Sequence, residues 1–198
     1  MNTVSITAEN RTNLGKKGTR AVRAEGKIPC VLYGSGDPLH FTVPAKSVKS
    51  LVYTPDFKVA DISIDGGTRQ AIVKDIQFHP VSEAIQHIDF LSMVEGTPIK
   101  VELPVRFSGV SPGVKSGGKL QQSMRRVKVK ANPENLTEDL KVDIGSLQLG
   151  QSVRVRDIEV PEGVEIMSAE ATPIATVIIP RALRSAATAE AKAAKVAK

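Results

Sequence analysis

The sequence predicts a mainly β protein, in which a first β domain with two or so short helices is followed by a second all-β domain and a low-complexity basic tail. Two observations lead to this fold class. Apolar residues alternate with polar ones along most of the chain, which is the period of strands that bury one face. The alternating segments are separated by Gly, Pro and Asp-Gly-Gly sequences that favour turns. Because only 4% of the residues are aromatic, the cores are expected to be mainly aliphatic.

The chain of 198 residues is long enough for two domains. A boundary is predicted near the Gly-Pro-containing segment "SMVEGTP". The predicted domains are therefore 1–94 and 95–180, and the tail is 181–198. The tail sequence "ALRSAATAEAKAAKVAK" has eight alanines and few apolar side chains that could pack, so it is expected to be disordered or weakly helical.

The first domain is expected to begin with a strand, to continue through a basic loop into a helix stopped by Gly26, and to end in four or five further strands. A second short helix is predicted with Pro44 in its first turn and with Val48 and Leu51 on one side. The predicted strands are "TVSITAE", "KIPCVLYG", "LHFTV", "FKVADISIDGG", "TRQAIVKDIQF" and "IQHIDFL", and the helices are "TRAVRAEG" and "PAKSVKSLVYT".

The second domain is expected to contain strands only, with Gly and Pro turns between them. Its predicted strands are "IKVELPVRFSG", "RRVKVKAN", "LKVDIG", "SVRVRDIEV", "VEIMS" and "PIATVIIP".

Net charge is unevenly distributed along the chain. Residues 1–94 carry 11 basic and 9 acidic side chains, residues 95–180 carry 11 of each, and residues 181–198 carry 5 and 1. Within the first domain, residues 11–27 hold six basic side chains against Glu25 alone. Positive charge is thus concentrated in one N-terminal segment and in the tail.

Residues 11–27 can follow a phosphate backbone, because Arg and Lys lie in a Gly-rich loop that leads into a short helix. Arg20 and Arg23 are three residues apart and share a helix face, while Arg11 and Lys16 fall in the loop. The alternative is that this segment only presents a solubilising charged face.

The stretch "DIQFHPVSEAIQHIDFL" contains two histidines and three acids. Residues two apart on a strand face the same way, so Asp75, Gln77 and His79 share one face of their strand, and His87 and Asp89 share one face of the next. If these strands are neighbours, all five side chains line one sheet surface.

Four interpretations of that surface are open. Two imidazoles and a carboxylate can bind zinc, although no helical HExxH spacing is present. A catalytic His–Asp pair would need a nucleophile, and Cys30 is expected to be in the core. The remaining two are a solvated polar face and a surface that recognises RNA base edges and 2′-hydroxyls.

A partial nucleotide-binding motif is present in "SPGVKSGGKL". Gly113, Gly118 and Lys119 match GxxxxGK, but Leu120 stands where the motif needs Ser or Thr for Mg²⁺. A strand rather than a helix is predicted to follow, so this segment is interpreted as a flexible Gly-rich loop between strands.

Two segments of the first domain, "RTNLGKKGTRAVRAEGKIPCVLYG" and "DIQFHPVSEAIQHIDFL", resemble the two signatures of the bacterial large-subunit ribosomal protein twenty-five, the family that binds 5S rRNA. "PVRFSGVSPGVKSGGKL" and "NPENLTEDLKVDI" resemble the extra β domain of its long form, the Ctc or general stress protein type. The resemblance covers residues 3 to about 180 in order. It implies that the first domain is a small β-barrel with flanking helices.

The resemblance also implies RNA-contacting residues. Those matched by position are Arg11, Arg20, Arg23, Tyr33, His87 and Asp89. The same surface adds Lys16, Lys74, Gln77 and His79. Short members often have Gln at the position of Lys74, and strand parity places Lys74 on the side of Ile72 and Ile76 unless a bulge intervenes. A lysine there favours a phosphate over a base edge.

We therefore expect a cytoplasmic, non-enzymatic structural constituent of the large (50S) ribosomal subunit, located in the central protuberance and acting in translation. Its expected partners are 5S rRNA and other large-subunit components, with no cofactor, metal, membrane or small-molecule substrate. A single cysteine allows no internal disulfide. Two rivals are a zinc-dependent hydrolase using His79, His87 and Asp89, and a stress-response interaction module that acts off the ribosome.

Overall fold

The computed structural model describes residues 2–34, 36–64 and 66–181. Contacts between Cα atoms divide the chain into two compact units, of which the first comprises residues 1–101 together with 130–138 and 162–164. In the described residues, no helix is both long and apolar enough to cross a membrane.

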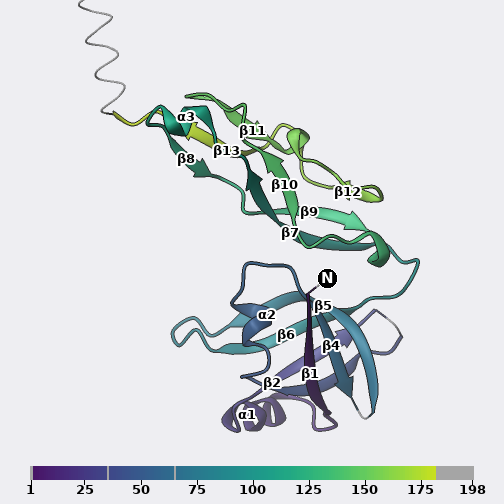
Figure 1. Ribbon diagram of the computed structural model, residues 1–198. Helices are drawn as coiled ribbons and strands as arrows, with labels where there is room; N and C mark the ends of the chain where they lie inside the picture. Colours follow the sequence, from purple (N-terminus) through teal and green to yellow (C-terminus); the bar gives the residue numbers. More distant parts are fainter. Residues whose placement is uncertain (1, 35, 65, 182–198) are drawn as a thin grey trace, which may run out of the picture. The chain divides into compact units, whose positions relative to one another are not determined.

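The first unit contains a closed six-stranded barrel with the strand order β1-β3-β2-β6-β5-β4 (Figure 1). The barrel is closed by parallel pairing of β1 with β4, and β2 also pairs in parallel with β6. Its elements are β1 (Thr3–Asn10), α1 (Lys16–Ala24), β2 (Lys27–Tyr33), β3 (Leu39–Pro44), α2 (Lys49–Val52), β4 (Val59–Ile64), β5 (Gly67–Phe78) and β6 (Ile85–Ser92). The mainly β fold and the small barrel predicted for this region are confirmed.

Every second side chain of the strands points inward and fills the barrel. Ile6 and Ala8 on β1, Phe41 on β3 and Phe90 on β6 point inward and are at most 7% exposed. The rings of Phe41 and Phe90 lie 5.8 Å apart between centroids, in a tilted arrangement. The core is otherwise aliphatic, as the low aromatic content predicts.

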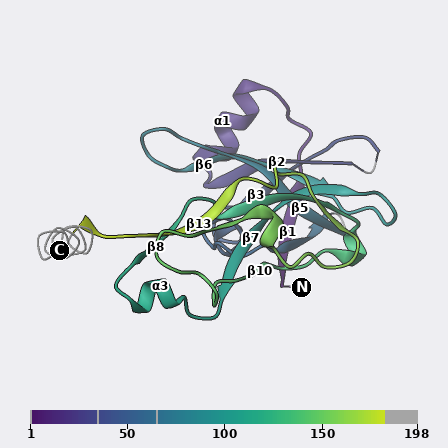
Figure 2. The ribbon, with the colours of Figure 1, turned by 90° about the horizontal axis from the view of Figure 1, so that it is seen from above.

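Two details of the predicted helices differ from the structure. The helix α1 begins at Lys16, earlier than predicted, and lies beside β2 (Figures 1 and 2). Pro44 is the last residue of β3 and not part of a first helical turn, because α2 begins only at Lys49. Val48 and Leu51, which were predicted to lie on one side of this helix, are both buried, at 0% and 8% exposed.

The second β domain contains a four-stranded sheet of order β10-β7-β9-β12 and a three-stranded sheet of order β11-β13-β8. Its elements are β7 (Ile99–Ser108), α3 (Pro112–Lys115), β8 (Lys119–Gln122), β9 (Arg126–Ala131), η1 (Pro133–Asn135), β10 (Leu140–Asp143), β11 (Ser152–Arg154), η2 (Val155–Asp157), β12 (Val164–Ile166) and β13 (Pro173–Ile178). The predicted strand "SVRVRDIEV" is shorter than expected, because a 3-10 turn follows Arg154. The prediction of a disordered or weakly helical tail lies outside the described residues, apart from Arg181.

The Gly-rich segment that partly matches a phosphate-binding loop is a packed turn. The helix α3 lies within it and β8 follows Gly118, so no helix follows the glycines. A Cβ atom at Gly113 would lie 2.7 Å from the backbone of Gln148, and one at Gly118 would lie 2.6 Å from the carbonyl oxygen of Gly113. These glycines are therefore needed for close packing, and the predicted loop between strands contains the short helix α3.

Removing one of the two buried phenylalanine rings of the barrel core should strongly destabilise the first unit. We expect Phe90→Ala to lower the free energy of unfolding by about 3–5 kcal/mol, because it removes a fully buried ring and leaves a cavity. Tyr53→Ala is the control, since Tyr53 is 61% exposed, and it should change stability by less than about 0.5 kcal/mol. Urea unfolding followed by circular dichroism measures both. Equal effects of the two substitutions would contradict the described core.

The single cysteine provides a second test of the core. Burial raises the pKa of the Cys30 thiol to about 12, so at pH 8 the folded protein holds almost no thiolate, which is the reactive form. We expect no reaction with Ellman's reagent in the native state and one equivalent after unfolding in guanidinium chloride. Rapid labelling of the native protein would show that β2 does not bury this residue.

Candidate nucleic-acid interface

Neighbouring strands β5 and β6 form a polar outer face on the barrel. Their antiparallel register places Asp75 opposite Asp89 and Gln77 opposite His87. Between these pairs, Ile76 is opposite Ile88 and points into the core. The prediction that these four polar side chains share one sheet surface is confirmed.

His87 and Asp89 form the clearest side-chain pair of this face. His87 Nδ1 lies 2.6 Å from Asp89 Oδ1, and the two side chains are 21% and 33% exposed. The carboxylate thereby fixes the orientation of the imidazole ring and holds the proton on Nδ1. In the described part of the chain, the pair leaves His87 Nε2 and the second carboxylate oxygen free to meet a ligand.

Tyr33 borders the same acids from β2. The parallel register pairs Val31 with Asp89 and Tyr33 with Leu91. Partial burial, followed by the charges of Asp89 and Asp75, raises the pKa of the Tyr33 phenol. The hydroxyl group therefore stays protonated at neutral pH and can donate a hydrogen bond.

Asp75 and Asp89 are like charges placed directly opposite each other, an arrangement that disfavours a sheet unless something compensates. Asp89 is bound to His87, whereas the Asp75 carboxylate is exposed and has no hydrogen-bond or ion-pair partner among residues 2–34, 36–64 and 66–181. Two adjacent carboxylates attract N–H and O–H donors, such as the exocyclic amino groups of nucleobases and the 2′-hydroxyls of RNA.

His79 departs from the predicted arrangement. The strand β5 ends at Phe78, and the β5–β6 register shifts between Gln77 and Phe78. The Nδ1 atom of His79 accepts hydrogen bonds from the backbone N–H groups of Val81 at 3.3 Å and Ser82 at 3.1 Å. This ring stabilises the turn between β5 and β6, and it is not in line with Asp75 and Gln77 on the face.

Lys74 occupies a β-bulge. The register shifts between Val73 and Asp75, so Lys74 is the additional residue and Ile72 and Ile76 lie on opposite faces. The ammonium group of Lys74 donates to the carbonyl oxygen of Lys100 at 3.2 Å, within the first unit. The exception stated for Lys74 therefore applies, because simple alternation does not continue through a bulge.

The helix α1 is fixed to the barrel through Arg23. Arg23 Nε donates a hydrogen bond to the carbonyl oxygen of Gln86 on β6 at 3.0 Å. At the start of the helix, Gly18 is buried, and a Cβ atom there would lie 2.4 Å from the carbonyl oxygen of Asn13. The basic loop thus packs closely on α1 and leaves Lys16 and Arg20 exposed.

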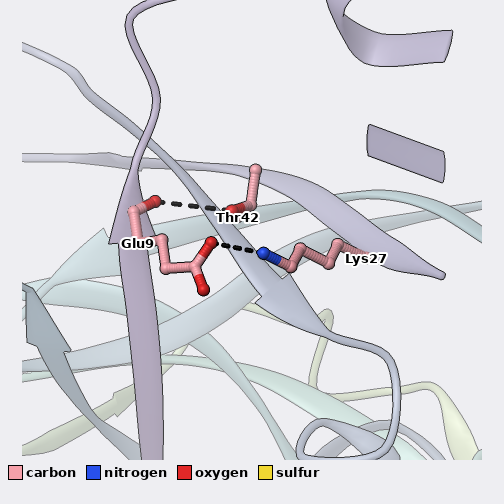
Figure 3. Close-up of polar contacts among 3 residues, drawn as sticks. All are labelled: Glu9, Lys27 and Thr42. Carbon is pink, nitrogen blue, oxygen red and sulfur yellow. Dashed lines mark hydrogen bonds and ion pairs between the residues drawn. The ribbon is translucent and has the colours of Figure 1, made fainter. Parts of the chain in front are cut away.

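Not every basic residue of this segment is free to meet a ligand. The ammonium group of Lys27 pairs with the Glu9 carboxylate, whose backbone carbonyl also accepts a hydrogen bond from Thr42 Oγ1 at 3.5 Å (Figure 3). The hydrogen bond to Glu9 raises the pKa of Lys27. By contrast, Lys16, Lys17 and Arg20 have no ion-pair partner within the described residues.

Arg11, a predicted site residue, meets His40, which was not predicted, at the β1–β3 edge of the face. The backbone N–H of Arg11 donates to the carbonyl oxygen of His40 at 2.9 Å, so these residues are cross-strand neighbours after β1 and on β3. His40 was not predicted as a site residue. The alternation in "LHFTV" carries the signal, because it turns His40 and Thr42 away from the buried Phe41 and Val43.

The described residues offer no geometry for a metal centre. No group of three His, Cys, Asp or Glu side chains in that part of the chain could hold a metal ion. His79 is turned toward its own loop, and Cys30 is fully buried in the core. What the face presents is a mixture of acceptors and donors beside a basic loop and helix.

Comparison with known proteins gives matches to both halves of the chain. The model of the Ribosomal L25p family matches residues 6–90, and that of the ribosomal protein TL5, C-terminal domain, matches residues 98–181. The chain is 43% identical to large ribosomal subunit protein bL25 of Phocaeicola vulgatus, over 97% of this chain and 100% of the relative. Proteins of the same name are 43% identical in Bacteroides thetaiotaomicron, over 94% of both chains, and 39% identical in Cytophaga hutchinsonii, over 97% of this chain and 100% of the relative.

The hydrogen bond between Arg23 and Gln86 predicts different roles for the two helix arginines. We expect Arg23→Ala to loosen α1 from the barrel and to increase amide hydrogen exchange in Lys16–Ala24 by roughly fivefold, the effect of losing about 1 kcal/mol. Arg20→Ala is the matched control, and it should leave exchange in α1 nearly unchanged because Arg20 is exposed. If both substitutions had the same effect, Arg23 would have no special part in positioning the helix.

Proposed function

The chain belongs to the ribosomal L25p family, and on this premise we propose that it binds 5S rRNA within the large ribosomal subunit. Members of this family are structural constituents of the ribosome and not enzymes. Their relatives are named as proteins of the bacterial large subunit, which acts in the cytoplasm. Binding to 5S rRNA, and a position in the central protuberance, are the finer parts of the proposal.

The polar outer face is the observation on which the proposal rests. A surface that bound nucleic acid by charge alone would not place Asp75 opposite Asp89, because carboxylates repel phosphates. Acids on a binding face suit a surface that accepts hydrogen bonds from base amino groups or 2′-hydroxyls. The protonated Tyr33 hydroxyl supplies a donor beside these acceptors. With the imidazole proton on Nδ1 toward Asp89, His87 Nε2 is a further acceptor.

The basic loop and helix supply the complementary contacts to phosphates. Lys16 and Arg20 are exposed and unpaired among the described residues, so we propose that they bind the RNA backbone. Arg23 and His79 are proposed to position other parts of the face. The guanidinium group of Arg23 holds α1, and the ring of His79 holds the β5–β6 turn. Gln77 faces His87 and is proposed to contact bases. Lys74 would reach RNA only by leaving the carbonyl oxygen of Lys100.

The second domain has a different charge balance. Residues 95–180 carry equal numbers of basic and acidic side chains, and some of them are paired, as Arg106 is with Asp139 at 3.0 Å. We propose that this domain contacts ribosomal protein or the periphery of the subunit more than 5S rRNA. A structure of the complex with its strands packed on RNA would contradict this part of the proposal.

Titration of 5S rRNA binding against salt concentration tests the two kinds of contact separately. Each lost phosphate contact should reduce the dependence of log K on log salt by about one unit. We therefore expect Lys16→Ala and Arg20→Ala each to lower the slope. The double substitution His87→Ala/Asp89→Ala should weaken binding about tenfold or more through lost edge contacts, with the slope little changed.

Two controls make this measurement decisive. Lys49→Ala removes an exposed basic residue of α2, and it should leave both affinity and slope near those of the wild type. An unrelated structured RNA of equal length should bind more weakly and should not respond to the His87→Ala/Asp89→Ala substitution. Equal affinity of the wild type for both RNAs would refute specific recognition of 5S rRNA.

A further inference from the structure

His40 lies on the proposed RNA-binding face, although no sequence signature marks it. Its strand β3 pairs with β2 so that His40 is opposite Val31, and Val31 is in turn opposite Asp89 on β6. Arg11 extends the β1–β3 ladder by its backbone bond to His40. A single cross-strand row on the outside of the barrel therefore runs from Arg11 through His40 and Val31 to Asp89, and Asp75 follows on β5.

The row has opposite charge at its two ends. Asp89 and Asp75 occupy adjacent strands at one end, while Arg11 and His40 occupy adjacent strands at the other. Three strand steps separate Arg11 from Asp89 along the row, and no ion pair joins the two side chains in the described residues.

At the basic end, polar nitrogen atoms are buried and have no partner. Arg11 Nε, Arg11 Nη1 and His40 Nδ1 are almost completely covered and make no hydrogen bond in the described protein. The neighbouring acid, Glu9, is paired with Lys27. Buried polar nitrogens without partners are costly, so a ligand that offered an acceptor to these cross-strand neighbours would stabilise this edge of the barrel.

The chemistry of these atoms defines the ligand. Guanidinium nitrogens can only donate hydrogen bonds, and the imidazole Nδ1 donates in one neutral tautomer. The two guanidinium nitrogens therefore need an acceptor oxygen, preferably an anionic one, and His40 Nδ1 can donate to the same oxygen in the tautomer that carries its proton. On a surface that binds RNA, the phosphate backbone supplies such an oxygen.

We propose that Arg11 and His40 together form a phosphate subsite at the β1–β3 edge of the face, with His40 as a contact residue for the RNA. This inference rests on the proposed binding of 5S rRNA. Because the nitrogen atoms are covered in the free protein, the long side chain of Arg11 changes rotamer when RNA binds. The subsite would anchor the backbone on one side of the nucleotides read by His87 and Asp89.

Binding of 5S rRNA to four variants tests the subsite. His40→Leu keeps much of the side-chain volume and removes both ring nitrogens, while His40→Asn keeps a polar atom near the position of Nδ1. Arg11→Ala and the double variant Arg11→Ala/His40→Leu complete a double-mutant cycle. Urea unfolding of each variant separates loss of binding from loss of fold.

We expect His40→Leu to weaken binding about fivefold or more, and His40→Asn to stay within about twofold of the wild type. Arg11→Ala should weaken binding and lower the salt slope by about one unit. If both residues hold the same oxygen, the double variant should lose less affinity than the product of the two single losses. The ring nitrogen resonances of His40 should also shift in the complex.

Different results overturn different parts of the proposal. If His40→Leu binds like the wild type while Arg20→Ala shows its lower slope, the His40 subsite is wrong and 5S rRNA binding stands. Losses that multiply without coupling would show that the two residues do not share a ligand. If the wild type binds 5S rRNA no better than an unrelated RNA, the proposed function and this subsite are both refuted.

Discussion

The register between β5 and β6 is the constraint on which the outer face depends. Side chains alternate along a strand, so a slip by one residue would turn Asp75 and Gln77 into the core and would expose Ile76. The bulge at Lys74 is part of this register. Before it, Ala71 and Val73 pack against the core, and after it Ile76 does. One additional residue thereby reverses the alternation and turns Asp75 outward beside Asp89.

Burial of the aliphatic core offsets the unfavourable free energy of the polar groups on the outer face. Like-charged Asp75 and Asp89 are opposite each other, and the nitrogen atoms of Arg11 and His40 are buried without partners. Each of these features disfavours the free protein. Directly beneath the same row, Cys30, Ile88 and Phe90 are 0% exposed. Burial of such side chains stabilises the barrel and offsets the cost of these polar groups in the free protein.

Sequence periodicity predicts this protein well where structure follows alternation alone. The strands, the hairpin between β4 and β5, and the shared face of Gln77 and His87 follow from it. Periodicity fails where a single side chain makes a specific contact or where a bulge interrupts the alternation. His79 bonds to its own turn, Lys74 sits in a bulge, and Arg23 binds a carbonyl oxygen contributed by Gln86, which is distant in sequence. Those contacts depend on tertiary distances that spacing in one segment does not contain.

In the proposed complex, the separation of charge across the face limits how RNA can bind. A polyanion attracted only by charge would lie along Lys16, Arg20 and Arg11, and it would avoid the carboxylates of Asp75 and Asp89. A strand that also offers amino or hydroxyl donors satisfies both ends of the row at once. Because the two ends are set apart by the barrel strands, the proposed binding favours an RNA with phosphates and donors at matching separation. On this proposal, the fixed spacing of the sheet, more than total positive charge, is the physical source of selectivity.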